Sequence, residues 1–356
     1  MSRKCKFSIV MPTYNRRELV RRSIAAIAAA EQPWPCELIV VVDGSTDGTA
    51  EALSTLELPL PVRVVEQANA GAARARNRGA AEAEGEFLLF LDDDMTADRR
   101  LLVEHARTLD AGADAVVGDI PLHPDSPSTL LTRGVADWAD ERRSRLRAAP
   151  GRLTPADFLT GQLSVRSTLF ADVGGFDEAL TAGGSFGGED TDFVFRLLQR
   201  TSRVEYNSAA ISYQRYLTEP AQNLRQWWES GRADAMLSRK HRALGAILWD
   251  QHRGSTMMGR VARRLSVLSP ALQDRLRAGV VRRVSAGHTD AVISWTYTQI
   301  REVAYWSGTR AGGGIVRRQH HGVRNIARPA DDRPDDSRAR TAPRVGAHGA
   351  RDDRQG

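Results

Sequence analysis

Short apolar runs alternate with amphipathic stretches along the first 120 residues of the chain. The run "CELIVVVD" at 36–43 is continuously apolar, which is typical of a strand buried on both faces of a parallel sheet. Strand and helix patterns alternating at this spacing predict βαβ units, and therefore an α/β fold with a mostly parallel sheet flanked by helices. The other predicted strands lie at 6–11, 61–67, 86–92 and 113–120. The predicted helices lie at 15–27, 46–56, 70–85 and 97–112.

The pattern changes after residue 120. It loosens over 121–150, strand and helix signals return at 160–200, and arginine-rich helical stretches follow from about 215. Beyond about 317 almost nothing apolar remains, so we expect disorder, because this stretch cannot bury enough surface to offset its ordering entropy. The predicted units are an α/β domain, a helical extension and a disordered tail, at 1–215 (halves 1–120 and 121–215), 216–317 and 318–356.

Composition and charge narrow the class of protein. The chain has 356 residues, 41% hydrophobic and 26% charged, which is an ordinary globular balance. Its net charge of +6 comes from scattered arginines, which leaves open nucleic acid, an anionic membrane surface or a phosphorylated ligand as partner. Two cysteines exclude a disulfide framework and a zinc cluster and favour a reducing compartment. No signal peptide or membrane span is evident, so we predict a soluble cytoplasmic protein, at most associated with the inner membrane face.

Polar motifs follow three of the predicted strands at their carboxyl ends. They are "PTYN" at 12–15, "DGSTDG" at 43–48 and "DDD" at 92–94. Ligands of parallel sheets bind outside the carboxyl ends of the strands, so we expect the three motifs to converge on one edge. In the first motif, Asn15 is expected to cap the helix that follows, with Glu18 as its capping-box partner.

The triplet Asp92, Asp93 and Asp94 is the most unusual of these motifs. One aspartate would suffice to cap a helix, whereas three neighbouring carboxylates repel one another. Mg²⁺ and Mn²⁺ take one or two protein carboxylates and fill their other positions with substrate phosphates. The triplet therefore predicts a divalent metal site, with a solvated acidic helix cap as the alternative.

Two other motifs each allow two interpretations. Asp43 either accepts hydrogen bonds from a base or ribose, or belongs to a plain strand-to-helix turn. Arg74 and Arg78 are one helical turn apart and share a face, while Arg76 points elsewhere. Arg76 therefore either reaches an anionic ligand or contributes to a solvated basic helix.

Glu189 and Asp190 follow a glycine-rich loop and open a predicted helix. The functional interpretation is a general base at the helix N-terminus, covered by the loop. The alternative is an acidic first turn that the helix dipole favours.

In their order and spacing, several segments together resemble family 2 glycosyltransferases over roughly residues 6–215. The resemblance implies a Rossmann-like GT-A fold and an inverting hexosyl transfer from a nucleotide-diphosphate sugar, expected to be a UDP-sugar, aided by Mg²⁺ or Mn²⁺. It makes 1–120 the nucleotide-sugar half and 121–215 the acceptor half. The segments are "SIVMPTYNR", "ELIVVVDGSTDGT", "NAGAARARNRGAAEAEGEFLLFLDDD", "GQLSVRSTLFADVGGFDE" and "GGEDTDFVFRL".

The resemblance also implies a role for each site residue. One carboxylate base is enough for an inverting transfer, because the acceptor hydroxyl attacks from the face opposite the leaving group. The implied roles are nucleobase contact for Pro12, Thr13, Tyr14 and Asp43, nucleotide contact for Arg76 and Asp92, metal ligation for Asp94 and Asp92, and catalysis for Asp190 beside Glu189.

The chain departs from the family pattern at two places. Val42 stands where many members have an acid before the aspartate of the second motif. Many members also have a histidine about 20 residues beyond the catalytic acid, where this chain has Tyr213 and Gln214, and His241 lies too far along to replace it. The middle acid, Asp93, is expected to point away from the ion and to tolerate substitution.

Three other functions remain as alternatives. A nucleic-acid-binding protein would use the arginine excess, but acids at strand ends repel phosphate unless metal is bound. A nucleotidyltransferase would be expected to have a glycine-rich basic loop after the first strand, and "PTYNRREL" is not such a loop. A catalytically impaired GT-A homologue acting as a binding or scaffold protein stays open because of Val42 and the missing histidine.

The acceptor is the least determined partner. A glycan, a lipid-linked sugar, a cell-wall polymer and a natural product all remain open. The C-terminal helices mix Leu, Val and Met with Arg, so they either touch an anionic membrane surface or pack on the catalytic domain. The segment "QWWES" at 226–230 is expected to pack or to line the acceptor side.

Overall fold

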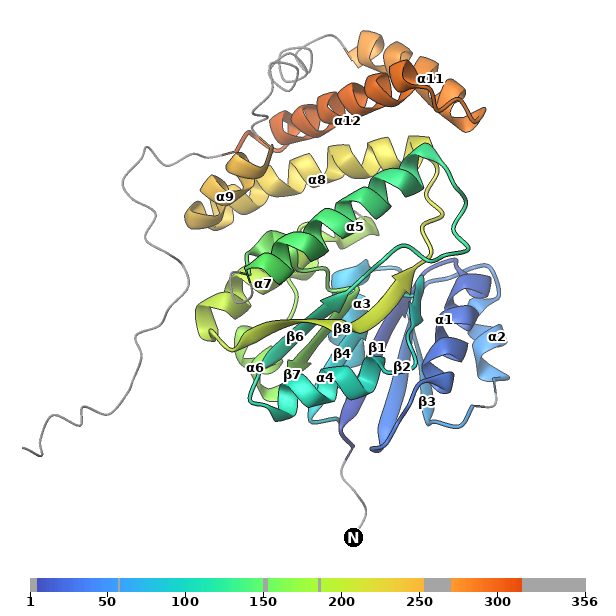
Figure 1. The fold of residues 1–356 in the computed structure, drawn as a ribbon, viewed down its shortest axis with the longest axis vertical. Coiled ribbons are helices and arrows are strands. Elements are labelled where there is room, and N and C mark those ends of the chain that lie inside the picture. Colours follow the sequence, from blue (N-terminus) through green and yellow to red (C-terminus); the bar gives the residue numbers. More distant parts are fainter. Residues whose placement is uncertain (1–4, 57, 150–152, 185–186, 253–269, 316–356) are drawn as a thin grey trace, which may run out of the picture.

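The computed structural model describes residues 5–56, 58–149, 153–184, 187–252 and 270–315 of the chain. One sheet with helices on both faces forms the body of the molecule, and a layer of long helices lies beyond it (Figure 1). The predicted disordered tail lies outside the described residues, and so does 253–269, which belongs to the predicted helical extension.

Eight strands form a single mixed sheet in the order β3-β2-β1-β4-β7-β6-β8-β5. The β3-β2-β1-β4 half is parallel, as predicted, but β7 pairs antiparallel with both β4 and β6. The α/β fold is therefore confirmed, with more antiparallel pairing than the sequence suggested. The strands are β1 (Phe7–Thr13), β2 (Cys36–Asp43), β3 (Val62–Gln67), β4 (Phe87–Leu91), β5 (Met95–Ala97), β6 (Ala115–Asp119), β7 (Gln162–Arg166) and β8 (Val204–Gln214).

The helices cover both faces of the sheet and extend beyond it (Figure 1). Short 3₁₀ turns at Pro155–Asp157, Glu178–Leu180 and Ala182–Gly184 connect some of them. The α-helices are α1 (Arg17–Ala29), α2 (Thr49–Ser54), α3 (Ala72–Ala81), α4 (Leu101–Asp110), α5 (Leu130–Ala148), α6 (Ser167–Val173), α7 (Glu189–Arg200), α8 (Pro220–Lys240), α9 (Arg242–His252), α11 (Pro270–Ser285) and α12 (Ala291–Ala311).

Side-chain alternation along the central strands divides the core into two layers. Ile9 and Met11 of β1 pack with residues of α1, α2 and α4 on one face, while Val10 packs with residues of α3, α6 and α7 on the other. Val42 lies in the first layer and is 2% exposed. Its side chain therefore packs in the core rather than facing the ends of the strands.

Helix α5 is a correction to the sequence prediction, which left 121–150 without a clear element. The helix has a capping box, in which Thr129 and Thr132 each accept a hydrogen bond from the other's backbone N–H. Its buried stripe includes Arg142, which donates hydrogen bonds to the carbonyl oxygens of Asp157 and Gly118. A buried arginine looks like a solvent-facing position in sequence, so the amphipathic pattern of this helix was concealed.

Helices α8 and α12 form the core of the C-terminal layer. Their backbones approach closely at Gly231 and Gly308, where a methyl group would lie 2.1 Å from the oxygen of Tyr305 and 1.8 Å from that of Trp228. Trp227, from the "QWWES" segment, contacts the ring of Tyr305 and the guanidinium of Arg301. Trp227 of this segment therefore packs between helices, which is the first of the two predicted alternatives, packing or lining the acceptor side.

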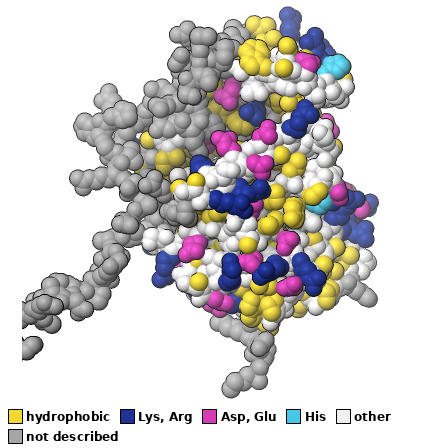
Figure 2. Space-filling model, viewed as in Figure 1, with side chains coloured by type: hydrophobic (Ala, Val, Ile, Leu, Met, Phe, Trp, Pro, Cys, Tyr) yellow, Lys and Arg dark blue, Asp and Glu magenta, His cyan; other side chains and the backbone are white. Residues whose placement is uncertain are grey.

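The surface and the helices give two further observations. On the face drawn in Figure 2, basic and acidic side chains are interspersed rather than separated into fields of one sign. Among the helices that the structure describes, none has the length and apolar character needed to cross a bilayer.

Candidate active site

The polar motifs meet at one end of the sheet because their strands are neighbours. Strands β2, β1 and β4 are adjacent and parallel, so the residues that follow them share an edge. Asp43 ends β2, Thr13 ends β1, and Asp92 directly follows β4. The structure thus confirms the predicted convergence of the three motifs.

Arg76 of α3 joins the acids of two separate motifs. Its Nη2 lies 2.8 Å from Oδ1 of Asp92, and its Nη1 lies 3.0 Å from Oε1 of Glu189 and 3.5 Å from Oδ1 of Asp190. Burial lowers the pKa of Arg76, but the three carboxylates outweigh it and hold the pKa above its usual range. The guanidinium therefore stays charged, and we call these four residues the acid cluster.

The position of Arg76 refines its predicted role. Arg74 and Arg78 lie on the exposed face of α3, whereas Arg76 is 4% exposed, as the helical spacing indicated. Both Nη atoms are nevertheless paired with protein carboxylates, while Nε is buried without a hydrogen-bond partner. Its contact with a nucleotide stays a prediction.

Glu189 and Asp190 have different surroundings at the start of α7. Burial, and then the charge of Asp190, raise the pKa of Glu189 to about 7, with Arg76 acting in the opposite direction. Asp190 is half-buried and accepts hydrogen bonds from the backbone N–H of Thr160, at 3.3 Å, and from its hydroxyl. Thr160 therefore fixes the orientation of the predicted base. It has no local sequence signal, because it lies 30 residues away in the loop before β7.

The same loop also approaches Asp92. The N–H of Asp92 donates to the carbonyl oxygen of Gly161 at 3.1 Å. A methyl group at Gly161 would lie 2.6 Å from Oδ2 of Asp92. Only glycine lets this loop approach the carboxylate so closely.

Asp94 is a buried carboxylate with a distant cationic neighbour, Nη1 of Arg16 at 4.0 Å from its Oδ2. Burial, followed by the charges of Asp92 and Asp93, raises the pKa of Asp94 to about 7. Its Oδ1 is buried without a hydrogen-bond partner, while its Oδ2 accepts a 3.3 Å hydrogen bond from Gln214. A bound cation would satisfy the orphaned oxygen and stabilise the ionised form.

The donor set around Asp94 suits a hard divalent ion. Carboxylate oxygens of Asp94 and Asp92 and the amide of Gln214 are the ligand types that Mg²⁺ and Mn²⁺ accept. No group of three or more His, Cys, Asp or Glu side chains is arranged to hold a metal within the part of the chain that the structure describes. A site that relies on two carboxylates and substrate phosphates does not require such a group.

The carboxylate of Asp93 is hydrogen-bonded to the first motif and to the residue that follows it. Its carboxylate accepts hydrogen bonds from the hydroxyl of Thr13 at 2.7 Å and from the Nη1 of Arg16 at 2.8 Å, and its carbonyl oxygen accepts one from Ser23 at 2.7 Å. Burial raises the pKa of Asp93, against the opposing effects of Arg16 and Thr13. The expectation that Asp93 tolerates substitution overlooked these bonds, because their partners lie 70 to 80 residues away.

The loop after β1 connects to the loop after β2. Asn15 does not cap α1, contrary to the prediction: it has a φ of 51°, and its Oδ1 accepts a hydrogen bond from the N–H of Thr46. The carboxylate of Asp47 accepts instead from the N–H of Arg17, the first residue of α1. Tyr14 is 49% exposed between these contacts, so its ring is available to a ligand.

Asp43 is buried and already well hydrogen-bonded. Its carboxylate accepts from the side chain of Gln67 at 2.8 Å and from the N–H groups of Ala70 and Gly71 at 2.9 Å each. These bonds fix the loop before α3. Contact of Asp43 with a nucleobase stays a prediction.

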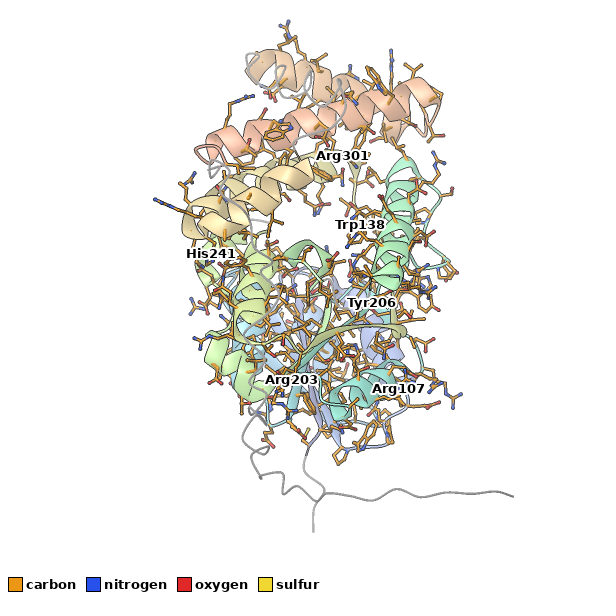
Figure 3. All side chains as sticks on the ribbon, turned by 60° about the vertical axis from the view of Figure 1, so that its left-hand side comes forward. Arg107, Trp138, Arg203, Tyr206, His241 and Arg301 are labelled. Atoms are coloured by element: carbon orange, nitrogen blue, oxygen red, sulfur yellow. The ribbon has the colours of Figure 1, made fainter. Side chains whose placement is uncertain are left out.

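The structure shows what occupies the place of the missing histidine. Gln214, at the end of β8, donates to Asp94 from that position. His241 lies at the far end of α8, where its Nε2 is 2.7 Å from Oδ1 of Asp192 (Figure 3). It therefore belongs to the contact of α7 with α8, in agreement with the prediction that it lies too far along.

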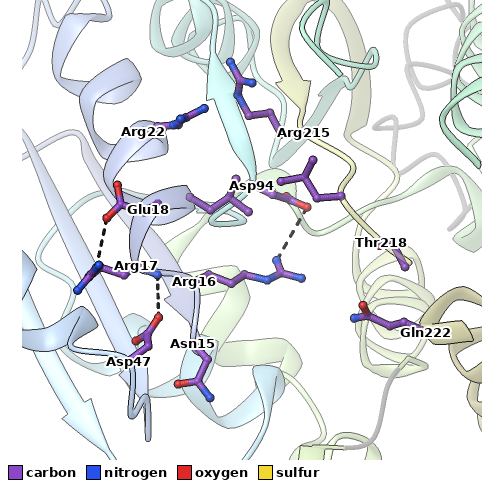
Figure 4. A pocket seen from close by; sticks show the side chains of 12 residues that line it. Asn15, Arg16, Arg17, Glu18, Arg22, Asp47, Asp94, Arg215, Thr218 and Gln222 are labelled. Atoms are coloured by element: carbon purple, nitrogen blue, oxygen red, sulfur yellow. Dashed lines mark hydrogen bonds and ion pairs between the residues drawn. The ribbon is translucent and has the colours of Figure 1, made fainter. Parts of the chain in front are cut away.

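A cleft of about 540 Å³ opens beside Asp94 (Figure 4). It lies between the start of α1 and the segment that follows β8. Arg16, Arg17 and Arg22 line it on the α1 side, and Arg215 lines it on the other. Each of the three polar motifs contributes one lining residue, Asn15, Asp47 or Asp94, but the wall formed by Arg215 had no sequence signal, because it lies almost 200 residues from Arg16 in the chain.

Comparison with known proteins agrees with this geometry. Residues 8–162 match the family model for glycosyl transferase family 2. Among solved structures, S. aureus TarS 1-349 is similar with a TM-score of 0.52 at 19% identity, over 86% of this chain and 90% of that chain. A TarS 1-349 complex with UDP gives the same score and identity, with 92% of that chain covered.

A second structure, the mannosyltransferase PcManGT from Pyrobaculum calidifontis in complex with GDP-Man and Mn²⁺, is similar with a TM-score of 0.54. The identity is 17%, over 86% of this chain and 87% of that chain. At such identities the likeness establishes the fold alone. Comparison with curated protein sequences gave no significant match.

The sheet order and the similar structures give the chain a fold of the GT-A type. The matched region holds the donor-side motifs, so this part of the chain is similar to glycosyl transferase family 2, as the sequence motifs indicated.

Proposed function

We propose that the protein transfers a sugar from a UDP-sugar to an acceptor hydroxyl with inversion at the anomeric carbon. In this reaction Asp190 takes the proton of the acceptor hydroxyl as the sugar is transferred. Glu189 and Arg76 position Asp190, and Asp92 contacts the ribose side of the donor.

The observation that carries this proposal is the acid cluster. A single guanidinium, that of Arg76, lies within 3.5 Å of Asp92 from the donor motif and of Asp190 from the base motif. The donor acid and the base are thereby held on either side of one charge, although 98 residues separate them in sequence. With Asp190 held this close to the donor acid Asp92, the base can reach an acceptor hydroxyl that lies over the sugar of a bound donor.

Asp94, with Asp92, would hold a Mg²⁺ or Mn²⁺ ion. When bound, the ion would neutralise the charge that develops on the leaving diphosphate. Support comes from the orphaned oxygen of Asp94 and from the Mn²⁺ that accompanies GDP-Man in the PcManGT complex. Gln214 would orient Asp94 through its hydrogen bond.

The donor assignment rests on similar proteins. TarS has been solved in complex with UDP and with UDP-GlcNAc, and PcManGT with GDP-Man. We therefore propose a UDP-sugar first and a GDP-sugar second. A catalytically impaired homologue is the alternative that the missing histidine suggests, but the complete acid cluster argues against it.

A donor-hydrolysis screen tests the proposal. UDP-, GDP- and TDP-sugars are offered with Mn²⁺ or with EDTA, and the released nucleotide is measured. We expect metal-dependent release with one base preferred. Asp190→Asn should lower the turnover number about 10²- to 10⁴-fold and leave the affinity for the nucleotide nearly unchanged, because a general base acts only in the chemical step.

Two further variants complete the experiment. Asp94→Asn should weaken nucleotide binding only when Mn²⁺ is present. Asp110→Asn changes an exposed aspartate paired with Lys6 and should match the unmodified enzyme. No nucleotide release with any donor, or full activity of both site variants, contradicts the proposal. Once an acceptor is found, NMR of the product anomer tests inversion.

A further inference from the structure

The cleft beside Asp94 is lined by four arginines, which the proposed reaction does not use, and also by the acids Glu18 and Asp47. Arg16, Arg17, Arg22 and Arg215 all line it. Of the residues proposed for the donor, the base and the metal, Asp94 is the one that also lines the cleft. The cleft thus meets the donor site at the metal-binding acid and continues away from it.

The four arginines differ in how far protein carboxylates already neutralise them. Arg16 is paired with Asp93, and Arg17 with Glu18. Arg215 is 19% exposed, and its Nη2 lies 3.1 Å from Nε2 of His123 and 3.2 Å from Asp125. The side chain of Asp125 is 72% exposed, so water screens the charge of this pair.

Arg22 has no ion pair with any of the residues that the structure describes, and its side chain is exposed at the cleft (Figure 4). Glu18, one turn earlier on α1, is instead paired with Arg17 and lies 3.8 Å from Arg21. The two walls of the cleft therefore present two guanidinium groups, those of Arg22 and Arg215, that can contact a new anionic partner. Arg215 adjoins Asp94, because its backbone N–H donates to the carbonyl oxygen of Asp94 at 2.9 Å.

The length of the basic lining exceeds what one diphosphate needs. Arg16, the residue before α1, and Arg22 of α1 are six residues apart, which corresponds to roughly 9 Å along a helix axis. A diphosphate bound to a metal at Asp94 would lie at the Arg16 end. Arg22 and Arg215 would remain for a second anionic group.

We propose that Arg22 and Arg215, on opposite walls of the cleft, bind a phosphate group carried by the acceptor. This assignment rests on the proposed function, because an acceptor presupposes sugar transfer. A planar guanidinium forms two parallel hydrogen bonds to one phosphate, and two such groups facing each other across a cleft recognise it strongly. The substrate class is therefore a phosphate-bearing acceptor rather than a neutral glycan.

Titration with glycerol 3-phosphate, a small phosphate monoester, tests the proposal on the full chain. Binding is followed by ³¹P NMR, first on the protein alone and then on protein saturated with UDP and Mg²⁺. We expect glycerol 3-phosphate to bind in both cases. Arg22→Gln and Arg215→Gln should each weaken it about tenfold, the usual effect of losing one charge-assisted contact.

Arg21→Gln is the matched control. It removes the same charge from the neighbouring position of α1, but Arg21 does not line the cleft. We expect unchanged binding in this variant and partial recovery in Arg22→Lys, which keeps the charge and loses the planar fork. Equal weakening by Arg21→Gln and Arg22→Gln would show a general charge effect and overturn the proposal.

Two further outcomes separate the sources of phosphate. If UDP displaces glycerol 3-phosphate, and Arg22→Gln weakens UDP binding instead, the cleft belongs to the donor diphosphate and the acceptor assignment is overturned. If glycerol 3-phosphate binds neither form, the proposal is also overturned. Failure of the proposed function is distinguishable, because it would abolish the binding of UDP and GDP without affecting glycerol 3-phosphate on the free protein.

Discussion

At the scale of single residues, the three neighbouring acids after β4 have three different environments. Asp92 pairs with Arg76, Asp93 supports the loop after β1, and Asp94 has a buried oxygen without a partner. Chain geometry turns successive side chains in different directions, so like charges that are adjacent in sequence need not face one another. The repulsion between the three carboxylates that the sequence suggests is thereby reduced, because each carboxylate has different surroundings.

The bonds of Asp93 predict a donor-binding defect when they are removed. Asp93→Ala leaves Thr13 and Arg16 without their carboxylate, so we expect the free energy of unfolding to fall by about 2 kcal/mol. We also expect the KM for the donor to rise about tenfold with a smaller change in kcat, because a displaced loop weakens binding of the base.

Urea unfolding and steady-state kinetics measure the two effects of Asp93→Ala. Asp110→Ala is the control, since its exposed pair with Lys6 contributes little. A purely structural role for Asp93 would lower stability and leave the donor KM unchanged.

At the scale of elements, close backbone approach decides how the C-terminal helices pack. Gly308 of α12 faces the carbonyl oxygen of Trp228 in α8, and Gly231 of α8 faces that of Tyr305 in α12. The contact is thus reciprocal, with one glycine on each helix. A side chain at either position would force the axes apart and loosen the contacts between the two helices.

Two glycine-to-alanine substitutions separate packing from helix propensity. Gly308→Ala places a methyl 1.8 Å from a backbone oxygen, so we expect it to destabilise the protein by about 1–3 kcal/mol. Gly279→Ala in α11 meets no described atom within 4 Å and should instead stabilise by up to about 1 kcal/mol, because alanine favours a helix. Thermal melts of both variants measure the difference. Equal effects would show that the helices do not pack as described.

At the scale of the whole molecule, the sheet gathers site residues from distant segments, and its core also buries a histidine. His105 of α4 is fully buried, and its Nδ1 lies 2.8 Å from the hydroxyl of Ser164 in β7. Burial lowers the pKa of His105 to about 3. The folded protein therefore keeps this imidazole neutral at pH values where the unfolded chain takes up a proton.

This difference makes His105 lower the stability of the folded state on mild acidification. The unfolded imidazole has a pKa near 6.5, so below that pH the unfolded state binds one proton more at His105 than the folded state does, until about pH 3. The contribution of His105 to stability should fall by about 1.4 kcal/mol per pH unit in this window, or about 2 kcal/mol between pH 6.5 and 5. Asp94 and Glu189, whose pKa values burial raises to about 7, act in the opposite direction, so the contribution of His105 is the difference between the protein and a His105 variant. Urea unfolding at the two pH values measures the slope.

Variants assign that slope to His105. On going from pH 6.5 to pH 5, the free energy of unfolding of His105→Gln should end about 2 kcal/mol higher, relative to its own starting value, than that of the unmodified protein. His288→Gln changes an exposed histidine and should keep the original slope. Identical slopes in all three proteins would contradict the assignment.

The sequence by itself determined the α/β fold, the convergence of the motifs at one edge and the similarity to glycosyl transferase family 2. Continuous apolar strands, such as the one at 36–43, allow only a sheet covered on both faces, and residues after adjacent parallel strands must then meet. These properties depend on local pattern and spacing, which can be read directly from the sequence. The sequence also showed that Arg76 points away from Arg74 and Arg78, because helical periodicity fixes that.

The tertiary structure decided what depends on contacts between distant segments. Arg76 joins Asp92 to Asp190, Thr160 orients Asp190, and the walls of the arginine-lined cleft come from residues almost 200 positions apart. The buried Arg142 concealed α5, and the β7 pairing made the sheet mixed. A pattern along the chain does not encode such pairings, because burial and partner choice depend on which surfaces the fold brings together.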